Sequence, residues 1–231
     1  MPQELNSPQN INYQIAIDGP AGSGKSTIAR LLAKKLGLIH IDSGAMYRAT
    51  TLFILRNNLT NKTKKDFLKR LKNLKINFVN KKTGQEILLN NHNVTQEIRG
   101  TEVNKNVSQV STINFIRSEM VKRQKNLALK NSVVMDGRDI GTTVLPNANL
   151  KIYLTADSHI RAERRKKELL KLTKNINMKD LIEQVHKRDN IDSSREISPL
   201  AKAQNAIVID SSNLAIGQVL EEIMLFIPNK K

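Results

Sequence analysis

The chain has 231 residues, of which 39% are hydrophobic and 26% charged, so it is long and apolar enough to bury a full core. It contains no cysteine, which excludes disulfides, zinc–thiolate sites, iron–sulfur clusters and cysteine nucleophiles. The 38 Lys and Arg against 21 Asp and Glu give a net charge of +17, which indicates an anionic partner: nucleic acid, a membrane surface or a phosphorylated substrate.

The N-terminal part of the chain predicts strands and helices around a glycine-rich turn. Residues 1–12 are polar and predict a loose tail. An apolar strand at 15–17 runs into the glycines, and apolar positions at helical spacing predict a helix over 25–36 that ends at Gly37. A second short strand is predicted at 38–41, and another helix follows it.

Residues 59–105 predict an insertion or small subdomain. The segment 62–75 holds seven basic residues and one acid, which predicts a solvated helix face; a dedicated polyanion site is the alternative. Two strand-like pieces at 76–79 and 86–89 flank a short polar turn and predict a hairpin.

The remaining chain alternates strands and helices without a repeat of fixed period. The expected strands are 133–135, 152–154 and 206–209, and the expected helices are 113–129, 158–172, 178–188 and a last one capped by Asn213 and running to 227. This alternation predicts an α/β fold with a parallel sheet and helices on both faces. The core then comprises 13–58 and 106–228.

The charge surplus also has a compositional explanation. Only 13 of the basic residues are Arg, and the 25 Lys are matched by 25 Asn, a pairing that an AT-rich coding bias produces without selection for a polyanion. Aromatic residues make up 3% of the chain and Trp is absent, which disfavours single-strand binding by base stacking. No apolar run reaches the roughly 20 residues that span a bilayer, and no signal peptide is recognisable. We therefore expect a cytoplasmic protein that does not bind a membrane.

The segment Gly19-Pro20-Ala21-Gly22-Ser23-Gly24-Lys25-Ser26 fits the phosphate-binding pattern G-x-x-x-x-G-K-[ST] between a strand and a helix. Its glycines permit a loop whose backbone N–H groups surround phosphates, and the helix N-terminus adds positive charge there. Lys25 is expected at the β- and γ-phosphates, and the Ser26 hydroxyl at Mg²⁺. The loop, continued by Thr27, predicts a user of nucleoside triphosphates but does not name the reaction.

Polar groups follow three of the predicted strands, at the edge where parallel sheets bind ligands. These are the segments 42–48 and 136–139, and Asp210, for which a turn or cap role is expected. In Asp136-Gly137-Arg138-Asp139, two carboxylates around an arginine could steady Mg²⁺, hold a phosphate and bind a base edge. Arg48 is placed one turn into its helix, facing the phosphate loop. Arginines suit phosphoryl transfer because they bind phosphate oxygens in bidentate fashion.

A second group of arginines predicts a lid over the triphosphate. Arg188 and Arg195 lie between a helix and Pro199 and favour a functional role. Arg161, Arg164 and Arg165 share one helix face. For these three, a lid and a solvated or salt-bridged face stay equally open.

At these residues the sequence resembles the bacterial cytidylate kinases. The matching segments are 17–27, 42–48, 136–142, Arg188-Asp189, Asp192-Ser193, Arg195 and Pro199-Leu200. The resemblance covers about Tyr13 to Ile227 in the expected order, insertion included. It implies a P-loop NTPase fold of three layers with an inserted monophosphate-binding subdomain at 59–105 and an arginine-bearing lid at about 158–198. The implied activity is transfer of the ATP γ-phosphoryl group to CMP or dCMP with Mg²⁺.

The resemblance also implies roles for single residues. The implied contacts are Arg48 and Arg138 to the acceptor phosphate, Ser43, Arg117 and Asp139 to cytosine, and Ser108, Arg188 and Asp192 to the sugar. Charge on the transferring group is neutralised by Lys25, Arg138, Arg188 and the lid residue Arg195. Ser108 and Arg117 rest on spacing in a weakly distinctive stretch.

Two other interpretations stay open. A small P-loop kinase could use UMP, AMP or a non-nucleotide alcohol as acceptor, and the charge alone would suit a nucleic-acid-binding protein without catalysis. The kinase interpretation expects ATP and CMP or dCMP as partners, no nucleic acid, and a monomer, because no heptad pattern or large apolar stripe indicates a further subunit.

Overall fold

The computed structural model describes residues 12–59, 64–81, 84–170 and 177–228. The predicted tail 1–12 lies outside the described residues except for Asn12, whose side chain donates to the carbonyl of Leu129 at 2.7 Å. No helix of the described part is long and apolar enough to cross a membrane.

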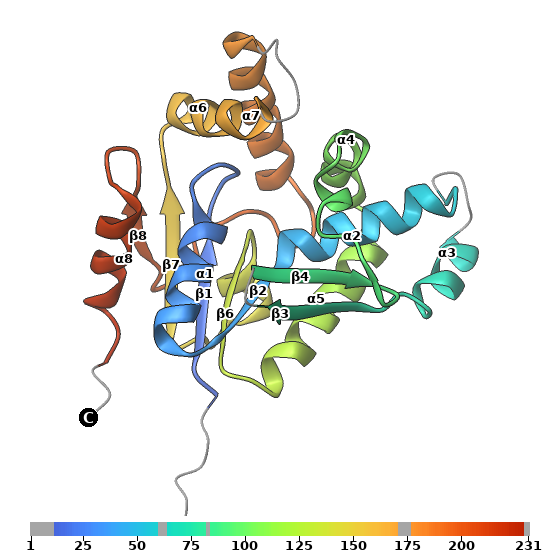
Figure 1. Cartoon of the computed structure of the whole chain (residues 1–231), viewed down its shortest axis with the longest axis horizontal. Coiled ribbons are helices and arrows are strands. Elements are labelled where there is room, and N and C mark those ends of the chain that lie inside the picture. Colours follow the sequence, from blue (N-terminus) through green and yellow to red (C-terminus); the bar gives the residue numbers. More distant parts are fainter. Residues whose placement is uncertain (1–11, 60–63, 82–83, 171–176, 229–231) are drawn as a thin grey trace, which may run out of the picture.

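A five-stranded sheet forms the centre of the molecule (Figure 1). In spatial order its strands are β2 (Ile39–Asp42), β6 (Val133–Gly137), β1 (Gln14–Asp18), β7 (Leu150–Thr155) and β8 (Ile207–Asp210). All four pairings are parallel. The predicted parallel sheet is confirmed, and all carboxyl ends of its strands lie at one edge.

The sheet is buried on both faces because consecutive side chains of a strand point to opposite sides. Ile15 and Ile17 of β1 pack in one core, while Ala16 packs in the other. The first core lies against α1 (Lys25–Leu36) and α8 (Ile216–Met224), and the second against α2 (Ser43–Arg56) and α5 (Asn114–Leu129). The predicted three-layer α/β fold is confirmed.

The segment from 64 to 110 adds a second, antiparallel sheet beside α2. Its elements are α3 (Lys64–Leu71), β3 (Ile76–Lys81), β4 (Gly84–Leu89), β5 (His92–Asn93), the 3₁₀ turn η1 (Glu97–Arg99) and α4 (Thr101–Val110). The predicted hairpin is confirmed as β3 and β4. Lys65, Lys69 and Arg70 of α3 are exposed, in agreement with a solvated basic face.

Two helices stand above the carboxyl ends of the central strands (Figure 1): α6 (Ser158–Leu169) and α7 (Met178–Ser193). They pack on each other through Ala162, Leu181 and Val185. The predicted end of α7 at 188 is wrong, since this helix continues to Ser193. Only Arg195 lies beyond it.

The cap predicted for the last helix is also wrong. The residue before α8 is Ala215 rather than Asn213, and its backbone N–H donates to Gln218 Oε1 at 2.8 Å. A glutamine inside the helix thus satisfies the N-terminal backbone in place of the expected asparagine. By contrast, the predicted end of α1 at Gly37 is confirmed by its left-handed φ of 69°.

Candidate active site

The phosphate-binding loop connects β1 to α1 at the carboxyl edge of the sheet. Gly24 precedes α1 with φ 91°, a conformation that side chains disfavour. Gly19 passes so close to β7 that an added Cβ would lie 2.0 Å from the carbonyl oxygen of Leu154. Thr27 lies in the first turn of α1, where its N–H donates to the carbonyl of Gly24 at 3.1 Å. The loop is therefore held as a turn that points the helix N-terminus at its centre.

Lys25 lies inside the loop. Its ammonium donates to the carbonyl of Pro20 at 2.6 Å and to Ser23 Oγ at 3.3 Å. These contacts use two of its three N–H groups and leave one for a phosphate oxygen. Burial, aided by the Arg138 charge, holds the pKa of Lys25 well below its ordinary value. An anion beside it would restore the preference for the charged form.

Asp136, at the end of β6, connects three elements. Its Oδ1 lies 2.8 Å from His40 Nε2, its Oδ2 accepts from Ser26 Oγ at 2.6 Å, and its carbonyl accepts from Ser43 Oγ at 2.6 Å. Burial alone would raise the pKa of Asp136, but the hydrogen bonds from His40 and Ser26, together with the charges of His40 and Lys25, hold the pKa below its ordinary value. Asp136 is therefore a carboxylate with both oxygens engaged.

Asp18, at the end of β1, fixes the neighbouring segment. Its two carboxylate oxygens accept from the backbone N–H groups of Ile140 at 2.8 Å and Gly141 at 2.7 Å. These residues begin the π-helical turn η2 (Ile140–Val144) that directly follows Arg138 and Asp139. Burial raises the pKa of Asp18 to about 6. The contact ties the predicted substrate-binding segment to the strand that carries the phosphate loop.

Arg117 and Asp139 form a buried pair. Arg117 Nη1 donates to Asp139 Oδ2 at 2.8 Å, and its Nε donates to the carbonyl of Ser111 at 3.0 Å. The Arg117 guanidinium also lies 5.2 Å from the ring centre of Tyr47, within the range of a cation–π contact. The structure thus brings together two of the residues that the resemblance assigned to cytosine.

Arginines converge above the strand ends with few carboxylates to balance them. Asp192 Oδ2 accepts from Arg138 Nε at 2.7 Å, and Asp192 Oδ1 lies 3.3 Å from Arg195 Nη1. Arg48 donates to Asn104 of α4, a neutral partner. Within the described chain, the buried Nε atoms of Arg188 and Arg195 have no hydrogen-bond partner. Such unpaired buried donors indicate an anion that the protein itself does not supply.

The pKa values of two of these arginines reflect this crowding. Burial first, and then the neighbouring charges of Arg138 and Arg48, lower the pKa of Arg188 to about 9. The pKa of Arg48 falls to about 10, again because of burial first, with Arg165 and Arg138 among the repelling charges. Arg48 and Arg188 are therefore less favourably charged than exposed arginines, because of burial first and of repulsion second. By contrast, Asp192 and Asp189 outweigh burial and raise the pKa of Arg138.

The arginines of α6 contact the phosphate loop. Arg161 donates to the carbonyl of Ala21 at 3.3 Å and to Asp189 Oδ2 at 2.6 Å. Arg164 donates to the carbonyl of Ser211 at 2.6 Å and weakly to that of Gly22 at 3.4 Å. Arg165 pairs with Glu168 at 3.1 Å. Arg161 and Arg164 are thus bound against the loop rather than solvated.

The comparisons with known proteins agree with this geometry. A family model described as cytidylate kinase matches residues 15–229. The chain belongs to the cytidylate kinase family. It is 45% identical to the cytidylate kinase of Bacillus subtilis (strain 168) over 94% of this chain and 96% of that protein. The cytidylate kinase of Carboxydothermus hydrogenoformans is 44% identical over 94% of this chain and 98% of that protein.

For this member of the cytidylate kinase family, the predicted site residues gather at one edge of the sheet. Ser108 lies on α4 four residues after Asn104, hence on the same helix face as the partner of Arg48. Asp210 stays apart and accepts from the Ser212 N–H at 2.9 Å, which confirms its predicted turn role. Sequence reasoning gave no role to His40 or Asn104. A single polar residue in an apolar strand or amphipathic helix carries no spacing signal.

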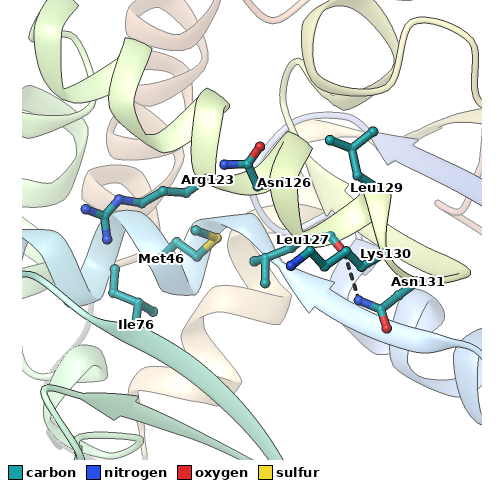
Figure 2. Close-up of a pocket in the computed structure, with 8 residues that line it drawn as sticks. All are labelled: Met46, Ile76, Arg123, Asn126, Leu127, Leu129, Lys130 and Asn131. Carbon is teal, nitrogen blue, oxygen red and sulfur yellow. Dashed lines mark hydrogen bonds between the residues drawn. The ribbon is translucent and has the colours of Figure 1, made fainter.

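A pocket of about 550 Å³ lies elsewhere, between α2, β3 and the end of α5 (Figure 2). The residues that line it are Met46, Ile76, Arg123, Asn126, Leu127, Leu129, Lys130 and Asn131. Arg123 is already bound to Glu119 and to two backbone carbonyls. None of the predicted site residues lines this pocket. A second pocket, of about 320 Å³, is lined by Arg195 and Ile191 and borders the arginine cluster.

The Asp18 carboxyl provides a test of this geometry through pH. Because its pKa is raised from 3.8 to about 6 on folding, the folded protein binds its proton more tightly than the unfolded chain. Ionisation of Asp18 therefore lowers the free energy of unfolding as the pH rises from about 4 to 6, by roughly 3 kcal/mol at about 1.4 kcal/mol per pKa unit. We expect Asp18→Asn to lack this loss.

Urea denaturation of the original protein and of Asp18→Asn, at several pH values between 4 and 7, measures this loss of unfolding free energy. The free energy of unfolding of Asp18→Asn minus that of the original protein should increase over this range. A difference that stays constant with pH would show that Asp18 does not titrate as its burial requires.

Proposed function

We propose that the protein transfers the γ-phosphoryl group of ATP to CMP or dCMP, giving ADP and CDP or dCDP. The observation that carries this proposal is the buried Arg117–Asp139 pair together with an arginine cluster that has unpaired donors. Arg138 and Arg188 of this cluster lie close enough to Lys25 of the phosphate-binding loop for their charges to lower its pKa. The names of the relatives, cytidylate kinase, support the same reaction.

The donor side is the loop at 19–27. Its backbone and the N-terminus of α1 bind the ATP phosphates, with Lys25 at the β- and γ-phosphates. The Ser26 hydroxyl donates a hydrogen bond to Asp136, which leaves its oxygen lone pairs for a cation. Mg²⁺ would be held here by the Ser26 hydroxyl together with the nucleotide, and it would neutralise part of the phosphate charge. The described chain holds no cluster of three or more His, Asp or Glu suited to a metal, which fits an ion held largely by phosphates.

The acceptor phosphate binds to the arginine cluster. Arg48 and Arg138 clamp it, and Arg188 lies close enough to both for their charges to lower its pKa. A dianionic phosphate supplies the negative charge that the cluster lacks, so binding relieves repulsion as well as forming hydrogen bonds. Ser108 and Asp192 hold the sugar hydroxyls together with Arg188. These contacts do not require a 2′-hydroxyl, in keeping with both CMP and dCMP as acceptors.

The base is selected by Asp139 with Arg117 and Ser43. Arg117 donates to Asp139 Oδ2, and the Ser198 side chain also hydrogen-bonds to this carboxylate. These two contacts fix the carboxylate, whose further lone pairs accept from the cytosine N4 amino group. The remaining guanidinium N–H groups of Arg117 donate to N3 or O2 of the ring. Uracil would place its O4 acceptor against the carboxylate, a mismatch that costs on the order of 1–3 kcal/mol by analogy with base recognition in nucleic-acid grooves.

The transfer needs no general base because the acceptor phosphate is already ionised. Negative charge on the phosphoryl group during its transfer is neutralised by Lys25, Arg138, Arg188 and Arg195. Catalysis consists of positioning the two substrates and of electrostatic stabilisation. Residues 158–198 act as the lid and 59–105 as the monophosphate-binding subdomain of a core at 13–58 and 106–228. Their closure excludes water and so suppresses hydrolysis of ATP. We further propose a cytoplasmic monomer that binds neither nucleic acid nor membrane.

The acceptor profile tests the proposal. ADP release, measured in a coupled assay with CMP, dCMP, UMP, AMP and shikimate, should be fastest with CMP or dCMP. A larger kcat/KM with UMP or AMP would overturn the cytosine assignment.

Lys25→Ala should abolish turnover. The matched change Lys34→Ala, on an exposed residue of the same helix, should leave it intact, since it removes the same charge outside the site. Retained function in Lys25→Ala with salt-sensitive binding of DNA or RNA would favour the nucleic-acid interpretation.

Asp139→Asn should change the preferred base. An asparagine amide can rotate its NH₂ group toward the uracil O4, so the acceptor clash disappears while a cytosine contact is lost. We expect the ratio of kcat/KM for UMP to that for CMP to rise by roughly 5- to 150-fold, the equivalent of 1–3 kcal/mol. An unchanged ratio, with both substrates impaired alike, would show that Asp139 supports the site without contacting the base.

A further inference from the structure

A buried histidine connects the second strand of the sheet to the phosphate-binding loop. His40 of β2 is 8% exposed, and its Nε2 lies 2.8 Å from Asp136 Oδ1 on the adjacent strand β6. The other oxygen of Asp136 accepts from Ser26 Oγ at 2.6 Å in the first turn of α1. Three elements far apart in sequence are thus joined by two consecutive hydrogen bonds through one carboxylate.

The direction of each hydrogen bond follows from its partners. Asp136 is ionised and can only accept, so His40 donates from Nε2 whether its ring is neutral or charged, and Ser26 donates from its hydroxyl. A carboxylate is rigid and planar, so fixing Oδ1 also fixes where Oδ2 lies. The orientation of the Ser26 hydroxyl therefore depends on the bond from His40 to the far oxygen.

The rest of His40 is held in place. Its carbonyl accepts from Gln85 Nε2 of β4 at 2.9 Å, and its strand pairs with β6 in a register that sets His40 opposite Val134 and Asp42 opposite Asp136. The ring can therefore move little relative to Asp136.

The ring makes no other hydrogen bond that would explain a buried histidine here. Its Nδ1 is buried and has no hydrogen-bond partner among the described residues. A strand position between apolar neighbours is satisfied by an apolar side chain at no desolvation cost, and an unpaired ring nitrogen adds to that cost. Among the residues that the structure describes, the one hydrogen bond of this imidazole is with Asp136.

We propose that His40 is a positioning residue for magnesium–nucleotide binding: it holds the Asp136 carboxylate so that Ser26 turns its lone pairs toward the cation. His40 itself touches neither the nucleotide nor the metal. The inference rests on the proposed function only in placing ATP with Mg²⁺ at the phosphate loop, and it is independent of the acceptor. Substitution of a residue that orients a metal ligand without touching the metal typically lowers affinity or activity by roughly 10- to 100-fold.

Calorimetric binding of ADP with and without Mg²⁺ tests the proposal without turnover. The quantity compared is the factor by which Mg²⁺ tightens ADP binding. We expect His40→Leu to reduce this factor by roughly tenfold, at the lower end of the range for such residues. His40→Gln should restore most of it, because the glutamine amide can donate to Asp136 Oδ1.

Thr51→Val is the matched control, since Thr51 is fully buried in α2 and donates only to its own helix at the Tyr47 carbonyl. It should lower the midpoint of thermal unfolding without changing the Mg²⁺ factor. The proposal is overturned if His40→Leu keeps the original Mg²⁺ factor, or if His40→Leu, His40→Gln and Thr51→Val all lose it alike. Because no acceptor is present, a wrong assignment of CMP would leave these outcomes unchanged and would appear only in the acceptor profile.

Discussion

The arrangement of the site depends on an excess of buried guanidinium charge over carboxylate charge. Arg138 and Arg195 share Asp192, Arg48 has a neutral partner in Asn104, and Arg188 Nε has no partner among the described residues. Burial and mutual repulsion lower the pKa values of Arg48 and Arg188. A protein tolerates such unfavourable buried charge when a ligand of opposite charge balances it. In the proposed reaction, the phosphates of the two nucleotides balance the charge of the arginines.

The sheet supplies the rigid frame that holds these charges in place. Parallel strands end at one edge, so Asp18, Asp42 and Asp136 lie at the carboxyl ends of three adjacent strands, and their side chains bind segments at that edge. Asp18 fixes the turn after Asp139, Asp42 caps α2, and Asp136 fixes Ser26. The carboxylates of the strand ends are thus occupied with structure, while the arginines above them keep donors for substrate.

Much of this could be predicted from the sequence, for physical reasons that differ between parts. The phosphate loop is contiguous, so its glycines, Lys25 and Ser26 identify it without tertiary information. The alternation of apolar strands with helices predicted the parallel sheet. The predictions that were wrong rest on weak local signals. Polar residues at the end of α7 do not distinguish helix from loop, and the N-terminus of α8 binds the side chain of Gln218 rather than that of Asn213. The contacts of Asp18 with Ile140 and of His40 with Asp136 span about a hundred residues and need the fold. Exposed lysines of α3 fit a compositional origin for part of the charge surplus. By contrast, four of the arginines lie close together at the site: Arg48, Arg138, Arg188 and Arg195.

The most direct test of this account is thermal unfolding of the protein with cytidine, with CMP and without ligand, at equal concentrations and low ionic strength. At equal concentration, a ligand that binds the folded state more tightly stabilises it more. The midpoint of thermal unfolding therefore reports how tightly each ligand binds the site. If phosphate is what completes the arginine cluster, CMP raises the midpoint by several degrees and cytidine leaves it near the ligand-free value. Equal stabilisation by cytidine and CMP would contradict the account, because the base would then bind without any help from the buried arginines.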